Sequence, residues 1–415
     1  MKKRRLSPRH YKEEMYDTKR AVLSYEQLPL EDYNQNKKDG NDKKAFLYKR
    51  LIIIIMVLVL LVAIVFVVFN RFSCSGCSRY NVSSSSFPVS VKGSQVNNGN
   101  FETYNEGFAY VSDTHYVLCD SSGEEIFNSQ VSFNDPILKL NHNGTALIYD
   151  LGGNHYNLYN KSNLVYSGET ETKMYLADIT SDSVFATVSE SRDYKAKLSV
   201  YNNDYTPLYG YSFEEYYITA MALNDDGTGA VACGITAENG LEKSVVYVFD
   251  FTEDKPQAFH QISNDVIFDC DYLSDGSVCL VGENASYVIC DKNFSKLHKN
   301  SYSQMTLTSY DINSDTGYLT LSLSRSGDGR NCTLQCINKS GKAEYQIATD
   351  YAAYFVDTYK NRIVISDKRN LYMYSQNGKF LSQNEISGDS RQVKLCASDA
   401  SVVLSLKDIS LYLFS

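Results

Sequence analysis

The sequence has no tryptophan and only six prolines in 415 residues, whereas tyrosine occurs 34 times. Beyond about residue 100 it also lacks any amphipathic helix pattern, and short apolar runs separated by turn residues take its place. Tyrosine and β-branched residues are enriched in strands, where proline is depleted. The missing helical periodicity excludes a helical bundle for most of the chain and predicts an all-β fold.

Specific catalytic and metal-binding motifs are missing as well. There is no H-E-x-x-H, no G-x-S-x-G and no phosphate-binding loop ending in Gly-Lys-Ser/Thr. No two histidines after residue 100 have metal-ligand spacing on one element; these are His115, His142, His155, His260 and His298. The sequence therefore predicts no catalytic residue, no metal and no cofactor.

Three aspartates resemble a calcium-binding loop without fitting one. Asp269, Asp271 and Asp275 follow the spacing of such a loop, but Leu273 stands where an oxygen ligand is needed. Gly282 stands where the bidentate glutamate belongs. We interpret this stretch as a hairpin turn.

The cysteines do not indicate a disulfide framework. Eight of the ten lie after residue 100, most of them in expected strands, where we expect buried thiols that act as small apolar side chains. A bridge between Cys332 and Cys336 stays open. Cys74 and Cys77 form an isolated C-x-x-C, which suits either a disulfide or two free thiols because a zinc site needs two more ligands.

Charge is absent from Leu51 to Phe69, nineteen consecutive residues that are nearly all Leu, Ile, Val and Phe. At about 1.5 Å per residue they would form a helix of roughly 28 Å, close to the ~30 Å hydrocarbon core of a bilayer. A soluble core does not need such a run, and the 50-residue leader argues against a cleaved signal peptide. The sequence predicts one transmembrane helix within residues 45–70.

The charges on either side predict the topology. Residues 1–50 carry a net charge of +6 and residues 71–415 carry −15. Lys43, Lys44, Lys49 and Arg50 flank the apolar segment, so the positive-inside rule places the N-terminus in the cytoplasm; the opposite topology would have to tolerate this bias.

We predict a single-pass plasma-membrane protein with four parts. A disordered basic cytoplasmic tail covers residues 1–44, the helix 45–70, a serine-rich stalk 71–87 and an extracytoplasmic domain 88–415. The negative charge of this last domain excludes nucleic acid as its partner.

A repeat runs through residues 100–415. One strand pattern recurs eight times at spacings of 39 to 48 residues, beginning with HYVLCD, HYNLYN and KLSVYN and ending with LYMYSQ and LYLFS. Each copy follows a second apolar strand, often introduced by an Asn-Gly or Asp-Gly turn, as at Asp226-Gly227. Units of 40–45 residues with four strands are typical of β-propellers, whereas two β-sandwiches would not require constant spacing.

The last unit stops after its third strand. Residues 88–97, which precede the first unit, can supply the missing outer strand and close the ring by pairing the two ends. The sequence therefore predicts a propeller of four-stranded blades, with eight blades favoured and seven as the alternative.

Strands such as SYVICD from Ser286, and HYVLCD followed by SSGEEIF from His115, resemble those of WD-repeat and quinoprotein-like propellers. The resemblance covers roughly residues 88–415, although without tryptophan the chain has neither the Trp-Asp dipeptide nor the tryptophan-docking motifs. The whole layout resembles a bacterial family of single-pass, membrane-anchored propellers of unknown function. This resemblance implies a fold and a topology, and no activity.

Three connections between second and third strands are long and polar: Ser189–Lys197, Gly234–Lys243 and Ser324–Asn331. In a propeller they open on the face that also carries the connections between blades. Long loops on a rigid face often bind partners. We predict a partner-binding rim, with tolerated surface insertions as the alternative; its residues are Arg192, Tyr194, Glu238, Arg325, Asp328 and Arg330.

Two functions fit this layout. The favoured one is a membrane-tethered extracytoplasmic module that binds or scaffolds a protein or glycan partner. The alternative is an enzyme with a site in the central channel, either a quinoprotein-like dehydrogenase or a hydrolase. That site would need convergent polar residues on the innermost strands, where LADIT and YFVDT offer Asp178 and Asp357.

Overall fold

The computed structural model describes residues 86–291, 294–326, 330–386 and 390–414. The chain divides into two compact units, 1–77 and 78–415, and all described residues belong to the second. The predicted tail, the transmembrane segment and most of the stalk lie outside the described residues. Within the described ranges, no helix is both long enough and apolar enough to cross a membrane.

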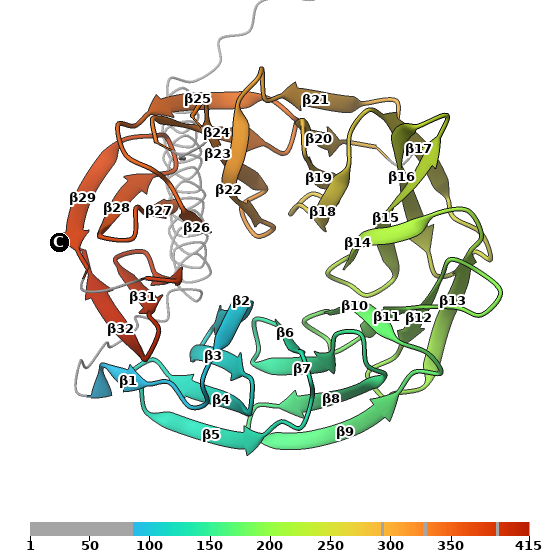
Figure 1. The fold of residues 1–415 in the computed structure, drawn as a ribbon, viewed down its shortest axis with the longest axis horizontal. Helices are drawn as coiled ribbons and strands as arrows, with labels where there is room; N and C mark the ends of the chain where they lie inside the picture. Colours follow the sequence, from blue (N-terminus) through green and yellow to red (C-terminus); the bar gives the residue numbers. More distant parts are fainter. Residues whose placement is uncertain (1–85, 292–293, 327–329, 387–389, 415) are drawn as a thin grey trace, which may run out of the picture. The chain divides into compact units, whose positions relative to one another are not determined.

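The described residues form eight separate four-stranded antiparallel sheets, which Figure 1 shows arranged as the blades of a ring. This confirms the predicted all-β propeller and its favoured count of eight blades. In blades 1 to 7 the chain runs outward from an innermost strand to an outermost one, and in blade 8 the outermost strand comes from the N-terminal side. The eight occurrences of the repeated pattern are the third strands, as the spacing predicted.

The first four blades take their strands in sequence order. Blade 1 contains β2 (Val96–Tyr104), β3 (Gly107–Ser112), β4 (His115–Asp120) and β5 (Glu125–Gln130). Blade 2 contains β6 (Pro136–Leu140), β7 (Thr145–Asp150), β8 (His155–Asn160) and β9 (Asn163–Glu169). Blade 3 contains β10 (Met174–Ile179), β11 (Phe185–Ser189), β12 (Ala196–Tyr201) and β13 (Pro207–Phe213). Blade 4 contains β14 (Tyr217–Leu223), β15 (Gly229–Glu238), β16 (Leu241–Asp250) and β17 (Ala258–Ser263).

The remaining blades complete the ring. Blade 5 contains β18 (Ile267–Tyr272), β19 (Val278–Gly282), β20 (Ala285–Ile289) and β21 (Leu297–Ser301). Blade 6 contains β22 (Thr306–Asn313), β23 (Tyr318–Ser324), β24 (Cys332–Asn338) and β25 (Ala343–Ala348). Blade 7 contains β26 (Phe355–Tyr359), β27 (Arg362–Ser366), β28 (Asn370–Ser375) and β29 (Phe380–Glu385). Blade 8 contains β30 (Gln392–Ala397), β31 (Ala400–Leu404), β32 (Asp408–Leu413) and, from the N-terminal side, β1 (Val89–Ser90).

The apolar core is divided among the interfaces between blades. Eight clusters of buried side chains are found in the described residues, and each joins two neighbouring blades. The second strands are buried on both faces, which explains why GFAYVS and TALIYD are continuous apolar runs and do not alternate. Tyrosine fills much of this space, as in the Tyr116–Tyr159 pair between blades 1 and 2, whose ring centroids lie 4.9 Å apart.

The ring closes where the first and last blades meet. β1 pairs with β32 through Val89–Ile409 and Ser90–Asp408, and the two lie side by side in Figure 1. The prediction that an N-terminal segment completes the last blade is confirmed, but only two of residues 88–97 form the strand. Val96 already belongs to β2. With two residues, β1 is the shortest strand in the described ring. It therefore pairs with only part of β32, which has six residues.

One expectation about local structure needs correction, and one open possibility is decided. Gly234–Lys243 is a continuation of β15 and β16 and not a long loop, because Asn239 and Gly240 adopt φ of 53° and 79° and make the two-residue turn that suits a hairpin. The bridge between Cys332 and Cys336 that the sequence left open is absent: none of the eight cysteines in the described residues forms a disulfide, and seven of them are buried, as expected.

Gly107 is required at the start of β3 by close backbone packing. A Cβ there would lie 2.0 Å from the carbonyl oxygen of Cys119, on the paired strand β4. We expect Gly107→Ala to lower the unfolding free energy by about 1–3 kcal/mol, because backbone cannot move aside as a side chain can. Gly210→Ala is the matched control, since its nearest neighbour lies 3.7 Å away. Equal denaturation midpoints for the two variants would contradict this account.

Candidate functional site

A ring of charged side chains lies on the innermost strands. The same register position recurs in all eight blades, and seven of the eight residues at it are charged. In blade order they are Glu102, Lys139, Asp178, Ala222, Asp271, Asp311, Asp357 and Lys394. We call these eight residues the charged ring; Asp269, two residues before Asp271 on β18, adds a sixth carboxyl group beside them.

One half of the charged ring is organised around Lys394. Its Nζ lies 2.8 Å from Oε2 of Glu102 on blade 1 and 3.3 Å from Oδ1 of Asp357 on blade 7. A single ammonium group on blade 8 therefore bridges both neighbouring blades. Burial alone would lower the pKa of Lys394, but the surrounding carboxylates outweigh it and raise the pKa, so the lysine stays charged.

The aspartates of the charged ring also bond to the backbone of the next blade. Asp178 Oδ2 accepts the N–H of Leu223 at 2.9 Å, and Asp357 Oδ2 accepts the N–H of Leu395 at 2.7 Å. Asp311 Oδ2 accepts the N–H of Thr358 at 3.1 Å and the hydroxyl of the same residue. These bonds satisfy N–H groups that face the centre, so part of the ring's role is to hold neighbouring blades together.

The other half of the charged ring lines a cavity of about 240 Å³. Lys139, Asp178, Asp269 and Asp271 face this cavity together with Tyr310, whose hydroxyl donates to Asp269 Oδ2 at 2.8 Å. No group of three or more histidine, cysteine or carboxylate side chains with the geometry to hold a metal occurs within the described ranges. The cavity is polar and its lining mixes both signs of charge.

The carboxyl groups of the channel lack enough positive charge. Burial, which Lys394 only partly opposes, raises the pKa of Asp357 to about 7. Burial also raises the pKa values of Asp178, Asp269, Asp271 and Asp311, with nearby lysines pulling in the opposite direction. Because six carboxyl groups share only two ammonium groups, the lysines do not cancel the effect of burial, and these five aspartates are harder to ionise than exposed ones.

A second cavity, of about 670 Å³, lies where the innermost strands of blades 5, 6, 7, 8 and 1 begin. We call it the channel mouth. Its wall includes Phe268 and Tyr354, which are 41% and 39% exposed, and its deeper lining includes Glu102, Asp311 and Lys394. Innermost strands begin at the connections between blades, so the channel mouth opens on the face that also carries the hairpins between second and third strands. We call this face the loop face.

The predicted rim residues lie on three blades of the loop face. Arg192 and Tyr194 are exposed between β11 and β12 of blade 3, and exposed Glu238 ends β15 of blade 4, where it pairs with Lys243. Arg325 and Arg330 are exposed on blade 6, so blade 5 separates them from the others. Asp328 lies outside the described residues. The rim remains a prediction.

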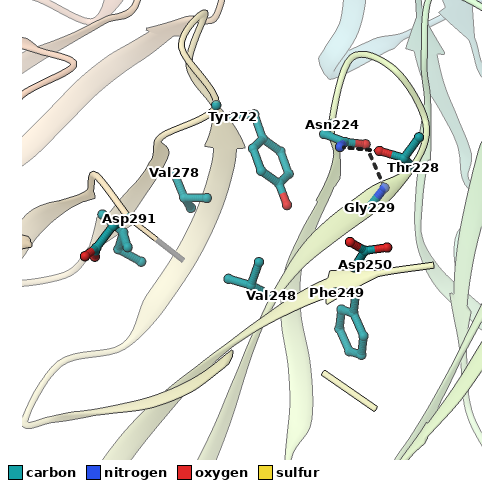
Figure 2. A pocket seen from close by; sticks show the side chains of 11 residues that line it. Asn224, Thr228, Gly229, Val248, Phe249, Asp250, Tyr272, Val278 and Asp291 are labelled. Atoms are coloured by element: carbon teal, nitrogen blue, oxygen red, sulfur yellow. Dashed lines mark hydrogen bonds between the residues drawn. The ribbon is translucent and has the colours of Figure 1, made fainter. Parts of the chain in front are cut away.

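A smaller crevice of about 140 Å³ lies between blades 4 and 5, and Figure 2 shows it from close by. Tyr272 lies between the two blades there. Asn224 bonds to the hydroxyl of Thr228 and to the N–H of Gly229, as the dashed lines in Figure 2 mark. Asp250 accepts a hydrogen bond from Thr252 in its own turn. These polar groups shape the hairpins, and the crevice offers no converging set for chemistry.

The residues at the centre were only partly predicted. Asp178 and Asp357 were expected on innermost strands, and both lie there, on blades 3 and 7. Asp269 and Asp271, which we interpreted as part of a hairpin turn, belong to β18 itself, and only Asp275 lies in the turn. The sequence does contain a signal for the charged ring, which we missed. In seven of the eight blades, the innermost strand has a charged residue seven to nine positions before the residue that it pairs with on the second strand.

The fold defines a β-propeller of eight four-stranded blades with a charged centre. The chain belongs to the DUF5711 family, a family of unknown function whose sequence profile matches residues 79–407. A search of curated proteins found no match. The family membership agrees with the resemblance to propellers of unknown function and assigns no activity.

Solved structures show the same fold at low sequence identity. BamB from Moraxella catarrhalis is 9% identical, with a TM-score of 0.50, covering 79% of this chain and 100% of that chain. Sqt1 from Saccharomyces cerevisiae is 9% identical, with a TM-score of 0.55 over 77% and 94%. Apo AztD from Citrobacter koseri is 8% identical, with a TM-score of 0.52 over 71% and 88%. At such identities the similarity concerns the fold alone.

Proposed function

We propose that this chain is a membrane-tethered scaffold that binds a partner protein outside the cytoplasm. The observation that carries the proposal is a strip of exposed apolar side chains on the loop face of blades 3 and 4. Tyr194, Tyr217 and Leu241 are 43%, 56% and 60% exposed. Lys195 Nζ lies 4.9 Å from the centroid of the Tyr217 ring, so a cation accompanies the strip. Tyrosine in such settings is enriched at protein interfaces.

The shape of blade 4 supports a protein partner. The β15–β16 hairpin continues past Ile235, which pairs with Tyr217, as far as the turn at Asn239 and Gly240. Leu241 lies beside that turn and offers a sugar no side-chain hydrogen bond. A rigid hairpin with an apolar tip loses little conformational entropy when a partner covers it. A protein therefore suits this strip better than the glycan that was also considered.

The tether rests on the sequence. As a helix, the apolar segment 51–69 would match the thickness of a bilayer core, and the basic residues before it favour a topology with the propeller outside the cytoplasm. A tether of this kind would keep the propeller near the membrane, which suits docking of envelope proteins.

An enzyme with a site in the central channel is the second candidate. The observation that favours it is the cavity in which Asp178, Asp269 and Asp271 meet beside Lys139, because carboxyl groups with raised pKa values can act as general acids. Against it, these aspartates are partnered with backbone and tyrosine donors or lie beside lysine. A hydrolase is the form of this alternative that these groups suit.

The scaffold proposal can be tested with a photo-crosslinking amino acid in the full-length chain in intact cells. Placed at Tyr194 or Tyr217, it should give a discrete adduct with one protein, whereas at Phe380, on the outer strand β29, it should not. In cells whose protein has Cys74, Cys77 and Cys290 replaced by serine, a membrane-impermeant maleimide should label Leu241→Cys and spare Ser7→Cys. An adduct pattern identical at all three positions, or labelling of Ser7→Cys alone, would overturn the proposal.

The channel alternative predicts a different result. Asp178→Asn keeps the acceptor for the Leu223 N–H but removes the charge facing the cavity. This variant should leave the Tyr194 adduct unchanged if the protein is a scaffold. Loss of a measurable hydrolytic activity in Asp178→Asn, with no adduct at either tyrosine in the parent protein, would favour the enzyme.

A further inference from the structure

The channel mouth combines an exposed aromatic wall with an acidic interior. Phe268 and Tyr354 stand at its edge, and the Phe268 ring lies 5.9 Å from that of Tyr310. Lys368, which does not line the cavity, has its Nζ 4.3 Å from the centroid of the Tyr354 ring. Aromatic faces attract cations, and they do so more strongly where water is partly excluded.

The interior of the channel mouth has more negative than positive groups. Glu102, Asp269 and Asp311 line it, with Lys394 as the one cation among the lining residues that the structure describes. Asp178 and Asp271 lie deeper, with Lys139. Carboxylates inside low-dielectric walls focus their field on the opening, so the opening attracts positive charge.

We infer that the channel mouth binds an extended basic segment of the partner protein, with a lysine or arginine side chain inserted between the aromatic wall and the carboxylates. This inference rests on the proposed scaffold function and adds the chemistry of the partner. The cavity of about 670 Å³ is far larger than a metal ion needs and has room for a long side chain with its flanking backbone.

The apolar residues that line the channel mouth favour a peptide over a small free cation. Leu307 and Phe355, which are partly exposed, also line the channel mouth, and covering this apolar surface with the residues on either side of the inserted cation is favourable. A free polyamine would leave that surface largely uncovered. Burial raises the pKa values of Asp311 and Asp269, so their attraction for a cation grows as the pH rises and they ionise.

The inference can be tested by fluorescence anisotropy with the full-length protein and three capped nonapeptides of Gly, Ser and Leu. The central residue is arginine in the first, norleucine in the second and glutamate in the third. The arginine peptide should bind roughly tenfold more tightly than the other two. Its binding should weaken as salt is added and as the pH falls from 8 to 5, because protonated carboxyl groups no longer attract it.

Two pairs of variants locate the site. Phe268→Ala and Asp269→Asn should each weaken binding of the arginine peptide roughly tenfold, and asparagine still accepts the hydrogen bond from Tyr310. Phe259→Ala is the matched aromatic control, since Phe259 is similarly exposed on the outer strand β17. Asp182→Asn, at an exposed position between β10 and β11 on the opposite face, is the charge control. Both controls should leave binding unchanged.

Several outcomes would overturn the inference. Equal binding of the three peptides, equal effects of site and control variants, or spermidine that binds as tightly as the arginine peptide would each do so. If a partner crosslinks at Tyr194 and the adduct is unaffected by Phe268→Ala and Asp269→Asn, the partner does not bind at the channel mouth. The scaffold proposal would then stand without this inference. If the peptide binds at the channel mouth but no adduct forms at Tyr194 or Tyr217, the site for a basic segment is supported. The apolar strip on blades 3 and 4 would then not be the partner's main contact.

Discussion

Replacing Lys394 with methionine is expected to lower the unfolding free energy by about 3–5 kcal/mol at pH 8. Methionine preserves most of the side-chain length but removes the cation that Glu102 and Asp357 share across three blades. Two carboxylates then remain in a mostly enclosed site without a counter-charge. Denaturant unfolding of the full-length protein, followed by far-UV circular dichroism, measures the loss.

The loss should be smaller at pH 5 than at pH 8. The pKa of Asp357 is raised to about 7 in the folded protein, above the ~3.9 of an unfolded aspartate. A raised carboxyl pKa means that the folded state binds the proton more tightly, so ionisation destabilises the fold as the pH rises from about 4 to 7. Without Lys394 this pKa rises further. At pH 5 the Asp357 carboxyl group of the variant is therefore protonated, and a neutral carboxyl group is not destabilised by the loss of the lysine's positive charge.

Lys161→Met is the matched control for this prediction. Lys161 Nζ lies 2.7 Å from Oε1 of Glu106 on the neighbouring blade, but the pair is exposed. Its loss should cost no more than about 1 kcal/mol and should not depend on pH in this range. If the two lysine variants behave alike, the charged ring does not hold the blades together.

Phe108→Ala should cost about 3–5 kcal/mol, because it opens a cavity in the cluster that closes the ring. Phe108 is fully buried beside Phe101, at a centroid distance of 5.9 Å, and the same cluster contains Val402 and Ile409 of blade 8. The two-residue strand β1 contributes little pairing at this seam, so the cluster carries most of the closure.

Two measurements check the role of Phe108. Its variant should unfold at a lower denaturant concentration, and limited proteolysis should cut first near β1. Phe380→Ala removes an equal side chain from a half-exposed position on the outer strand β29 and should cost less than about 1 kcal/mol. Equal midpoints for the two phenylalanine variants, or first cleavage in another blade, would contradict the assignment of the seam.

Much of the propeller could be predicted because its repeat is local. Strands such as HYVLCD and TALIYD are short apolar runs between turn residues, and their constant spacing requires neighbouring units of one kind. Glycines 144, 227 and 276 adopt positive φ where Asn-Gly and Asp-Gly turns were expected. The hairpin at Asn239 and Gly240 follows the same rule, and it was missed because the polar residues around it look like a loop.

The charged centre could be predicted only in part. Asp178 and Asp357 were recognised as candidates, but nothing local distinguishes Lys139 in PILKL or Lys394 in QVKLCA from solvent-facing lysines. Their partners are distant in sequence: Lys394 meets Glu102 only because the last blade packs beside the first. Proximity of this kind arises from ring closure and is not encoded within one repeat.

The sequence by itself determined the strand order, the eight units, the closure from the N-terminal side and the absence of specific catalytic motifs, because each follows from patterns a few residues long. Only the tertiary structure decided that eight register positions form one ring, that six carboxyl groups share two lysines, and that an aromatic wall opens on the loop face. Burial and charge pairing depend on which strands meet around a common centre, and that depends on the whole ring.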